Sequence, residues 1–283
     1  MPGITERLLY RVAKRWIAGY NLEDAILDAQ HTNEKKMAAI VNRLGEHTPD
    51  RKLIEEYVEE YLKLMDSMHE ANVIGAISVK PSQLGLTAEK SLFSENLDRI
   101  LDKAKETKRS VWVDMENSPY TENTIQVYRE HFNSYQDLGL CLQANLRRTR
   151  SDLENLLGIG SMIRLVKGAY PESADVAFKK KSEVDQNYLG LLRILFENGS
   201  RFVVGTHDDK LIAQAKVLNK ERSVDFEFEF LKGIRDDLKD KLVDEGYKVG
   251  EYIPYGPEWY NYSKRRLRER KRNILLLMRS MTG

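Results

Sequence analysis

The sequence predicts an α/β fold, a closed parallel (βα)8 barrel of the TIM type, and three observations support it. Short apolar segments of strand length alternate with amphipathic helical segments along most of the 283 residues. Eight strand–helix units follow one another, and their strand segments are almost continuously apolar, as in strands buried on both faces. No linker rich in Pro, Gly or Ser interrupts the series. We therefore expect one somewhat distorted barrel domain over residues 1–283.

The individual elements follow from the apolar pattern. The predicted strands are 37–44, 73–79, 110–115, 139–144, 161–167, 201–205, 224–230 and 248–253. The predicted helices are 4–17, 21–30, 52–69, 92–106, 121–133, 152–158, 182–197, 209–219, 235–245 and 258–280. The helix over 52–69 has the clearest pattern, because Ile54, Tyr57 and Tyr61 share one face. The first strand is the least distinct, since 37–44 also suits a helix. The first two helices form an N-terminal extension over 1–35.

Composition and charge narrow the classes of function. The 45 Lys and Arg residues nearly balance the 44 Asp and Glu residues, so the net charge of +1 favours neither nucleic acid nor an anionic membrane as a partner. The single cysteine, Cys141, suits a reducing compartment. No apolar run of about 18 residues predicts a membrane-spanning helix, and Arg7 and Arg11 interrupt any apolar signal core. We expect a cytoplasmic protein; docking to a membrane surface and the oligomeric state stay open.

Polar residues follow nearly every predicted strand. In a (βα)8 barrel the carboxyl ends of the strands surround one opening, where ligands bind. The sequence lacks the CxxC and HxxxH spacings of metal sites, so no metal is expected. A strand followed by Gly205-Thr-His207-Asp208 can offer free amides to a phosphate, although it is also an ordinary helix start. The polar residues at strand ends are Glu46, Lys80, Asp114, Gln143, Arg164, Lys167, His207 and Tyr252.

The last predicted helix carries the densest cluster of charge. Tyr262, Arg265, Arg266 and Glu269 fall at i, i+3, i+4 and i+7, and therefore on one face. Adjacent guanidinium groups grip carboxylates in pairs, so this face suits an anionic ligand. A solvated basic helix face would look the same. The further cations at the strand ends favour an anionic substrate, an anionic cofactor, or both.

Five motifs together carry a family resemblance. They are Leu44-Gly-Glu46, Ile77-Ser-Val-Lys80-Pro-Ser-Gln-Leu-Gly-Leu86, Arg164-Leu-Val-Lys167-Gly-Ala-Tyr170, Gly205-Thr-His207-Asp208 and Tyr262-Ser-Lys-Arg265-Arg266-Leu-Arg-Glu269. With these motifs the chain resembles the monofunctional proline dehydrogenases from about Trp16 to its end. The resemblance implies a flavoenzyme that oxidises L-proline to Δ1-pyrroline-5-carboxylate, binds FAD without a covalent bond and passes electrons to a quinone-type acceptor.

The resemblance also implies roles for individual residues of the substrate site. Lys80, Arg265 and Arg266 correspond to cations that clamp the proline carboxylate, so that one C–H bond points at the flavin. Glu46 corresponds to a glutamate that pairs with a clamp arginine and gates the site; a surface carboxylate is the alternative. The implied catalytic residues are Lys80, Asp114, Tyr252, Tyr262, Arg265 and Arg266, and the implied substrate-binding residues are Lys80, Leu231, Tyr252, Tyr262, Arg265, Arg266 and Glu269.

A second set of residues is implied to bind the cofactor. Arg164 corresponds to the cation that stabilises the reduced flavin. The implied reaction is direct hydride transfer from proline C5 to flavin N5 with the amine neutral, so the rate should rise with pH. Pro171-Glu172 departs from the bifunctional relatives, which carry an aromatic residue there. The implied FAD-binding residues are Gln143, Arg164, Lys167, Gly168, Ala169, Tyr170, Thr206 and His207.

Other functions compete with this one. A Schiff-base-forming lyase on the same barrel would use Lys80 or Lys167 as its nucleophile. A binding protein for flavin or an amino acid, without catalysis, would need the same anion-binding residues. Nothing in the chain resembles the aldehyde dehydrogenase half of the bifunctional enzymes, so a separate pyrroline-5-carboxylate dehydrogenase would consume the product. The choice between proline and hydroxyproline stays open.

Overall fold

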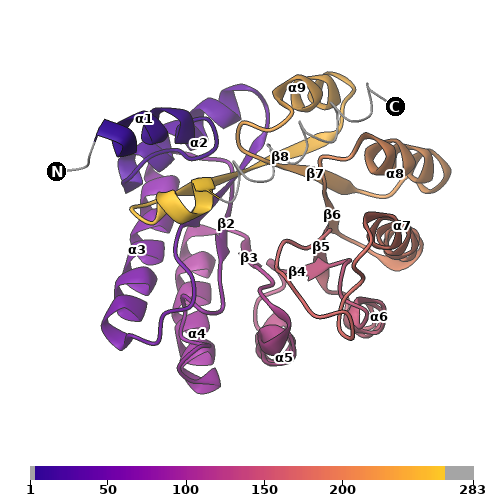
Figure 1. The fold of residues 1–283 in the computed structure, drawn as a ribbon, viewed down its shortest axis with the longest axis horizontal. Helices are drawn as coiled ribbons and strands as arrows, with labels where there is room; N and C mark the ends of the chain where they lie inside the picture. Colours follow the sequence, from indigo (N-terminus) through magenta and orange to yellow (C-terminus); the bar gives the residue numbers. More distant parts are fainter. Residues whose placement is uncertain (1–3, 265–283) are drawn as a thin grey trace.

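Parallel strands close into one barrel, and helices surround it (Figure 1). The structure, a computed structural model, describes residues 4–264, with side chains from Leu9 onward. In this range the strands are β1 (Ala38–Arg43), β2 (Gly75–Val79), β3 (Val111–Val113), β4 (Leu138–Gln143), β5 (Met162–Val166), β6 (Phe202–Gly205), β7 (Phe226–Leu231) and β8 (Lys248–Tyr255). The helices are α1 (Ile4–Ala13), α2 (Leu22–Glu34), α3 (Arg51–Glu70), α4 (Lys90–Thr107), α5 (Ser118–Phe132), α6 (Thr149–Leu157), α7 (Lys181–Asn198), α8 (Asp209–Arg222) and α9 (Asp236–Asp244).

The predicted TIM-type barrel is confirmed, including its least distinct strand. Each strand pairs in parallel with the next one in sequence, and β1 also pairs with β8, which closes the sheet. The predicted helix over 4–17 ends earlier, at Ala13. The chain turns after Ala13, and the Ala18 N–H donates a hydrogen bond of 2.9 Å to the Pro254 carbonyl oxygen of β8.

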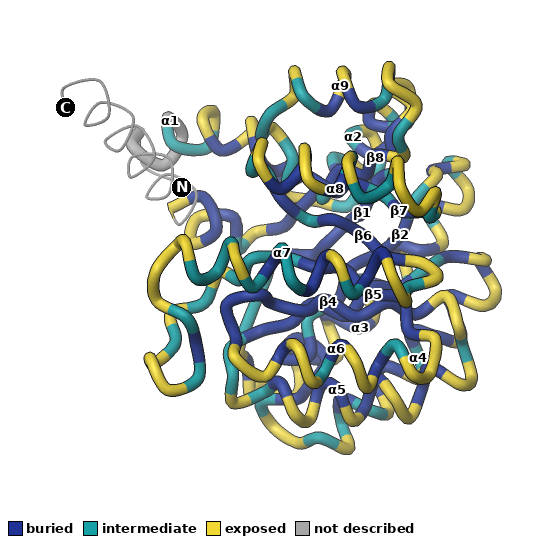
Figure 2. Tube along the Cα trace, turned by 90° about the vertical axis from the view of Figure 1, so that its right-hand side faces the viewer, coloured by how far each residue is buried: buried dark blue, intermediate teal, exposed yellow. Residues whose placement is uncertain are grey.

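The strands are buried on both faces, whereas the helices expose their outer faces (Figure 2). On β7, for example, Phe226, Phe228 and Phe230 belong to the main apolar core. A second, smaller cluster fills part of the barrel interior, and it includes Ile40, Trp112, Met162 and Val203 with Tyr252 packed against it. The alternation along each strand therefore separates side chains that pack under the helices from those that face the interior.

The N-terminal extension packs on the segment that follows β8. The indole Nε1 of Trp16 donates a buried hydrogen bond of 2.9 Å to Ser263 Oγ, and Trp259 packs edge-on against Tyr10 and Tyr20. Residues 259–264 are helical, at the start of the helix predicted over 258–280. Figure 1 shows this short yellow segment beside α1. Among the described helices, none combines the length and the apolar character needed to cross a bilayer.

Candidate active site

Asp114, directly after β3, is the centre of a polar group inside the barrel. Its Oδ2 accepts hydrogen bonds from Lys80 Nζ at 3.1 Å and from the Tyr252 hydroxyl at 2.7 Å. Its Oδ1 accepts hydrogen bonds from Arg164 Nη2 at 2.6 Å and from Ser78 Oγ at 2.9 Å. These side chains come from strands β2, β5 and β8 and from the residues directly after β2 and β3. The structure therefore brings together four residues that the sequence nominated from separate motifs.

Burial and ion pairing oppose each other in this group. Burial by itself lowers the pKa of Lys80 and of Arg164, but neighbouring carboxylates raise both well above their ordinary values. Burial raises the pKa of Asp114, yet Lys80 and Arg164 outweigh it and hold this pKa below its usual range. Burial and the Asp114 charge both raise the pKa of the Tyr252 hydroxyl. At neutral pH the group therefore contains two cations, one carboxylate and a neutral phenol.

Two members of this group, Ser78 and Glu229, were not predicted from the sequence. Arg164 Nη1 donates to Glu229 Oε2 at 2.8 Å, so the guanidinium lies between two carboxylates. Ser78 Oγ accepts from Arg164 Nη2 at 2.8 Å. A signal was present in the sequence: Ser78 stands two residues before Lys80, and Glu229 alternates with phenylalanines. In a strand, such spacing places the residue on the interior face.

Glu116, which the sequence did not nominate either, is completely buried beside this group. Its carboxylate accepts hydrogen bonds from the Ser82 amide at 2.8 Å and from Ser82 Oγ at 2.7 Å. Its main-chain oxygen accepts from Gln143 Nε2 at 2.6 Å. Burial raises the pKa of Glu116, and Lys80 and Ser82 oppose this effect. These contacts hold Gln143, a nominated cofactor residue, against the end of β3.

The other nominated cofactor residues lie beyond β5 and β6. Lys167 Nζ pairs with Asp185 at 2.5 Å and with Asp208 at 2.8 Å. Burial raises the pKa of Asp208, but the hydrogen bonds and charges of Lys167 and Lys181 outweigh burial and hold this pKa low. Thr206 is buried, and its Oγ1 accepts from the Asp208 amide at 3.3 Å. Lys167 and Thr206 therefore meet at the amino end of α8.

The loop after β5 and the end of β7 flank this region. Gly168 has a left-handed φ of 101°, and Tyr170 is half-buried with a pKa raised by burial. Ala169 is exposed. His207 Nε2 accepts a hydrogen bond of 3.0 Å from the amide of Leu231. The nominated residues His207 and Leu231 are therefore neighbours.

The remaining nominated residues divide into three cases. Glu46 Oε1 lies 3.9 Å from Lys80 Nζ, so it is close to the Asp114 group. Tyr262 belongs to a separate apolar cluster with Trp16 and Trp259. Its helical spacing did not reveal this, because the N-terminal extension supplies the partners. Lastly, Arg265, Arg266 and Glu269 lie outside the described residues.

The two lysines proposed for a Schiff-base lyase do not suit that chemistry. A nucleophilic lysine needs a lowered pKa, because only the neutral amine attacks a carbonyl. The pKa of Lys80 is instead raised, since Asp114 and the other acidic groups around it together outweigh burial. Lys167 is paired with two aspartates. The lyase alternative is therefore not supported.

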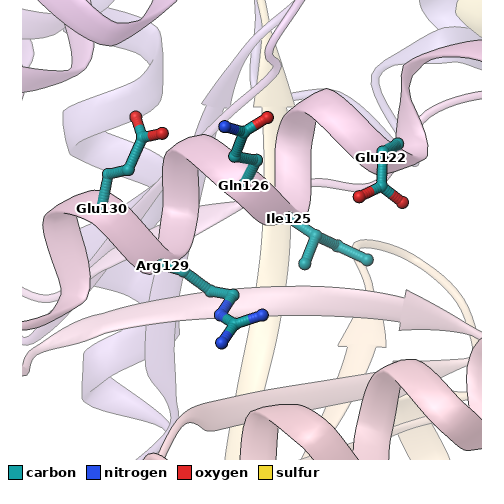
Figure 3. Close-up of a pocket in the computed structure, with 5 residues that line it drawn as sticks. All are labelled: Glu122, Ile125, Gln126, Arg129 and Glu130. Atoms are coloured by element: carbon teal, nitrogen blue, oxygen red, sulfur yellow. The ribbon is translucent and has the colours of Figure 1, made fainter.

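A shallow depression of about 320 Å³ lies elsewhere, on α5 (Figure 3). Its lining comes from this helix alone, and the side chains in Figure 3 are not those at the strand ends. We assign it no role in the chemistry. The lining residues are Glu122, Ile125, Gln126, Arg129 and Glu130.

Comparison with known proteins relates the chain to a family. Residues 25–275 match the family model described as proline dehydrogenase. The chain is 34% identical to proline dehydrogenase 2 of Bacillus subtilis (strain 168), over 97% of this chain and 94% of that protein. It is also 34% identical to the proline dehydrogenase of Deinococcus radiodurans, over 98% of this chain and 92% of the relative.

Solved structures agree on the fold. Proline utilization A from Bdellovibrio bacteriovorus, inactivated by N-propargylglycine, superposes with a TM-score of 0.86 at 24% identity. The match covers 94% of this chain but only 33% of that longer protein. The corresponding protein of Corynebacterium freiburgense superposes with a TM-score of 0.78 at 22% identity, over 93% of this chain and 31% of that one. With the family model and the full-length relatives, the result is plain: the chain belongs to the proline dehydrogenase family.

Proposed function

We propose that the chain oxidises L-proline to Δ1-pyrroline-5-carboxylate, with FAD as the bound electron acceptor and a quinone-type compound as the next one. Family membership makes the chain an oxidoreductase that acts on proline, in the first step of proline catabolism. The observation that best supports the proposed site is the convergence of Lys80, Arg164 and Tyr252 on Asp114 inside one barrel. Lys80 has three ammonium N–H donors and gives one of them to Asp114, so it can also bind a small anionic substrate.

The side chains after β4, β5 and β6 fit a flavin nucleotide. Asn145 Oδ1 is buried and has no hydrogen-bond partner among residues 4–264, and it can accept a hydrogen bond from a ligand. A Cβ on Gly168 would lie 2.0 Å from this oxygen, so the backbone can approach closely only as glycine. Lys167 and the amino end of α8 supply positive charge for a phosphate. When bound there, FAD would accept the two electrons that proline loses.

Gln143, Arg164, Lys167 and the nearby loop would hold the cofactor. Gln143 is fixed by its bond to Glu116, and Arg164 by its two carboxylates. Thr206 and His207 are proposed to lie toward the phosphates, whereas Gly168, Ala169 and Tyr170 border the flavin ring. Since Lys167 is already paired with Asp185 and Asp208, a phosphate would share this lysine with them.

Lys80 is proposed to orient the substrate. Asp114 holds its ammonium group, so the charge that faces the proline carboxylate is fixed in direction before proline binds. Arg265 and Arg266 complete the clamp in this proposal, with Glu269 holding an arginine in place. Leu231 and Tyr252 would border the ring, and Glu46 would act as the gate.

Asp114 is a poor proton acceptor, and this shapes the mechanism. Its two oxygens already accept four hydrogen bonds, and the nearby cations keep it ionised. The Tyr252 hydroxyl stays protonated and donates to Asp114. We therefore propose that proline binds with a neutral amine, whose lone pair assists departure of hydride from C5. The rate of substrate capture should rise with pH as the ammonium form of proline is depleted.

The domain organisation, the cellular location and the partners are proposed as the sequence indicates them. We propose that residues 1–283 form one domain, in which 1–35 are an extension packed on the barrel. The protein is cytoplasmic, and a separate dehydrogenase consumes the product. Proline and FAD are its small-molecule partners, and no nucleic acid is involved.

Anaerobic flavin reduction tests the proposed function. The purified protein should be yellow, and chromatography of the denatured protein should identify FAD. L-proline should bleach the flavin absorbance without oxygen, and deuterium at C5 should slow the bleaching; D-proline is the control. A colourless protein that cannot be reconstituted with FAD, or a yellow one that L-proline does not bleach, would contradict the proposal.

A further inference from the structure

Strand β7 places two glutamates in the barrel interior, one above the other. Its three phenylalanines join the main core, so the alternate residues Glu227 and Glu229 face inward. Both lie beside Gly250 of β8: a Cβ added there would be 2.2 Å from Glu227 Oε1 and 3.0 Å from Glu229 Cγ. The glycine therefore makes room for two carboxyl groups of the same chemistry, two residues apart on one strand.

Of the two glutamates, Glu229 is the one that contacts the group around Asp114. Its Oε2 accepts from Arg164 Nη1 at 2.8 Å, while the other prong, Nη2, donates to Asp114 at 2.6 Å. The Arg164 guanidinium carbon also lies 4.8 Å from the centre of the Trp112 ring and 5.5 Å from that of Tyr252. The side chain of Arg164 is only 3% exposed. Glu229 therefore holds Nη1, the guanidinium nitrogen of Arg164 that does not contact Asp114.

The two glutamates differ in charge as well as in contact. Glu227 makes no hydrogen bond or ion pair with a side chain of the described residues, and burial with the Glu229 charge raises its pKa to about 8. Glu227 is therefore mostly neutral at pH 7. Burial also raises the pKa of Glu229, but the Arg164 charge and hydrogen bond oppose it. With Glu229 ionised, its charge and that of Asp114 balance Lys80 and Arg164.

We propose that Glu229 is a positioning residue for proline oxidation, holding Arg164 against Asp114 and cancelling one positive charge beneath the substrate and the flavin. The inference rests on the proposed function. Two consequences follow. Without the Glu229 charge, Arg164 should stabilise a reduced, anionic flavin more strongly and so raise its reduction potential. Without the contact, Arg164 and Asp114 should hold Lys80 and Tyr252 less firmly, which lowers kcat/KM.

Three substitutions separate charge from contact. Glu229→Gln keeps an acceptor for Arg164 but removes the charge. Glu229→Asp keeps the charge but is one methylene too short for the contact. Glu227→Gln is the matched control, because it makes the same change on the same strand, where the carboxyl is already neutral at pH 7. The potential of the bound flavin is measured by equilibration with a reference dye, and kcat and KM for L-proline are measured beside it.

We expect Glu229→Gln to favour flavin reduction about tenfold, which is about 30 mV for a two-electron couple. Glu229→Asp should keep the wild-type potential and lower kcat/KM about tenfold, the loss expected when one charge-assisted contact is broken. Glu227→Gln should match the wild type in both. Equal potentials in Glu229→Gln and the wild type would overturn the inference, as would equal shifts in Glu227→Gln and Glu229→Gln. Should Glu229→Gln not fold, a Glu229→Asp enzyme with wild-type kcat/KM would overturn it. Failure of L-proline to bleach the wild type would instead count against the proposed function.

Discussion

Asp114→Asn should destabilise the protein strongly, although only one atom of the side chain changes. Each Asp114 oxygen accepts two hydrogen bonds, from Ser78 and Arg164 at Oδ1 and from Lys80 and Tyr252 at Oδ2. An asparagine keeps one acceptor oxygen and presents a donor in place of the other. Two buried donors therefore lose their acceptor, and Lys80 and Arg164 lose a counter-charge that is 11% exposed.

The magnitude follows from these lost contacts. Neutralising one partner of a buried ion pair costs about 3–5 kcal/mol, and two charge-assisted hydrogen bonds of about 1.5–3 kcal/mol each give a similar sum. For a chain of this size, 1 kcal/mol lowers the unfolding temperature by roughly 2–4 °C. We therefore expect the midpoint to fall by about 6–20 °C. The KM for L-proline should rise in parallel, because Lys80 and Tyr252 lose their shared anchor.

Scanning calorimetry of the flavin-bound protein at pH 7 measures this effect. Asp66→Asn is the matched control, because Asp66 is 51% exposed and its pair with Lys103 at 3.2 Å lies on the surface. That control should lower the midpoint by no more than about 2–4 °C, since an exposed pair contributes at most about 1 kcal/mol. An Asp114→Asn midpoint within the range of the control would refute the reasoning.

Three further predictions concern pH, cofactor binding and the last helix. The pKa of Glu227 is raised to about 8 in the folded state, whereas an unfolded glutamate has a pKa of about 4.3. The stability of the protein should therefore fall as pH rises between these two values, and Glu227→Gln should lack this fall. Unfolding temperatures from pH 5 to 9 measure the difference. Gly168→Ala should leave the protein with little bound FAD, because the new Cβ would lie 2.0 Å from Asn145 Oδ1 and the backbone φ is 101°. Gly190→Ala is the control, because a Cβ there meets nothing in the middle of α7; it should keep the full FAD content and gain about 0.8–1 kcal/mol in stability. Ser263→Ala removes the acceptor of the Trp16 indole, at the start of the helix that is predicted to carry Arg265 and Arg266. The KM for L-proline should therefore rise about fivefold, the effect of about 1 kcal/mol, with little change in kcat. Unchanged steady-state kinetics would contradict this prediction.

The strands of the barrel could be read from the sequence because burial on both faces leaves a nearly continuous apolar segment. The polar residues after those segments could be recognised because each one ends an apolar run. Lys80 and Asp114 each end an apolar run, and in a parallel barrel all such ends meet at one opening. The topology therefore predicts that the two residues lie near each other, and the structure adds their direct hydrogen bond.

Other parts of the site depend on long-range packing, which the local pattern does not contain. The pattern of β7 shows that Glu229 faces inward, but not that Arg164 extends across the barrel to meet it. Glu116 stands close behind Asp114 and has a different environment, since it is buried against Ser82. The helical spacing predicts that Tyr262 shares a face with the clamp residues, yet Tyr262 packs in the Trp16 cluster, because the N-terminal extension covers that position.

The central claim is that proline binds inside the barrel against the Asp114 group. A crystal structure with FAD and tetrahydrofuran-2-carboxylate, a proline analogue with oxygen in place of the ring nitrogen, tests it most directly. The account predicts a ligand carboxylate oxygen within about 3.2 Å of Lys80 Nζ, with the ring against Tyr252 and the flavin beyond the ends of β4, β5 and β6. A ligand bound outside the barrel, or a Lys80 that faces away from it, would contradict the account.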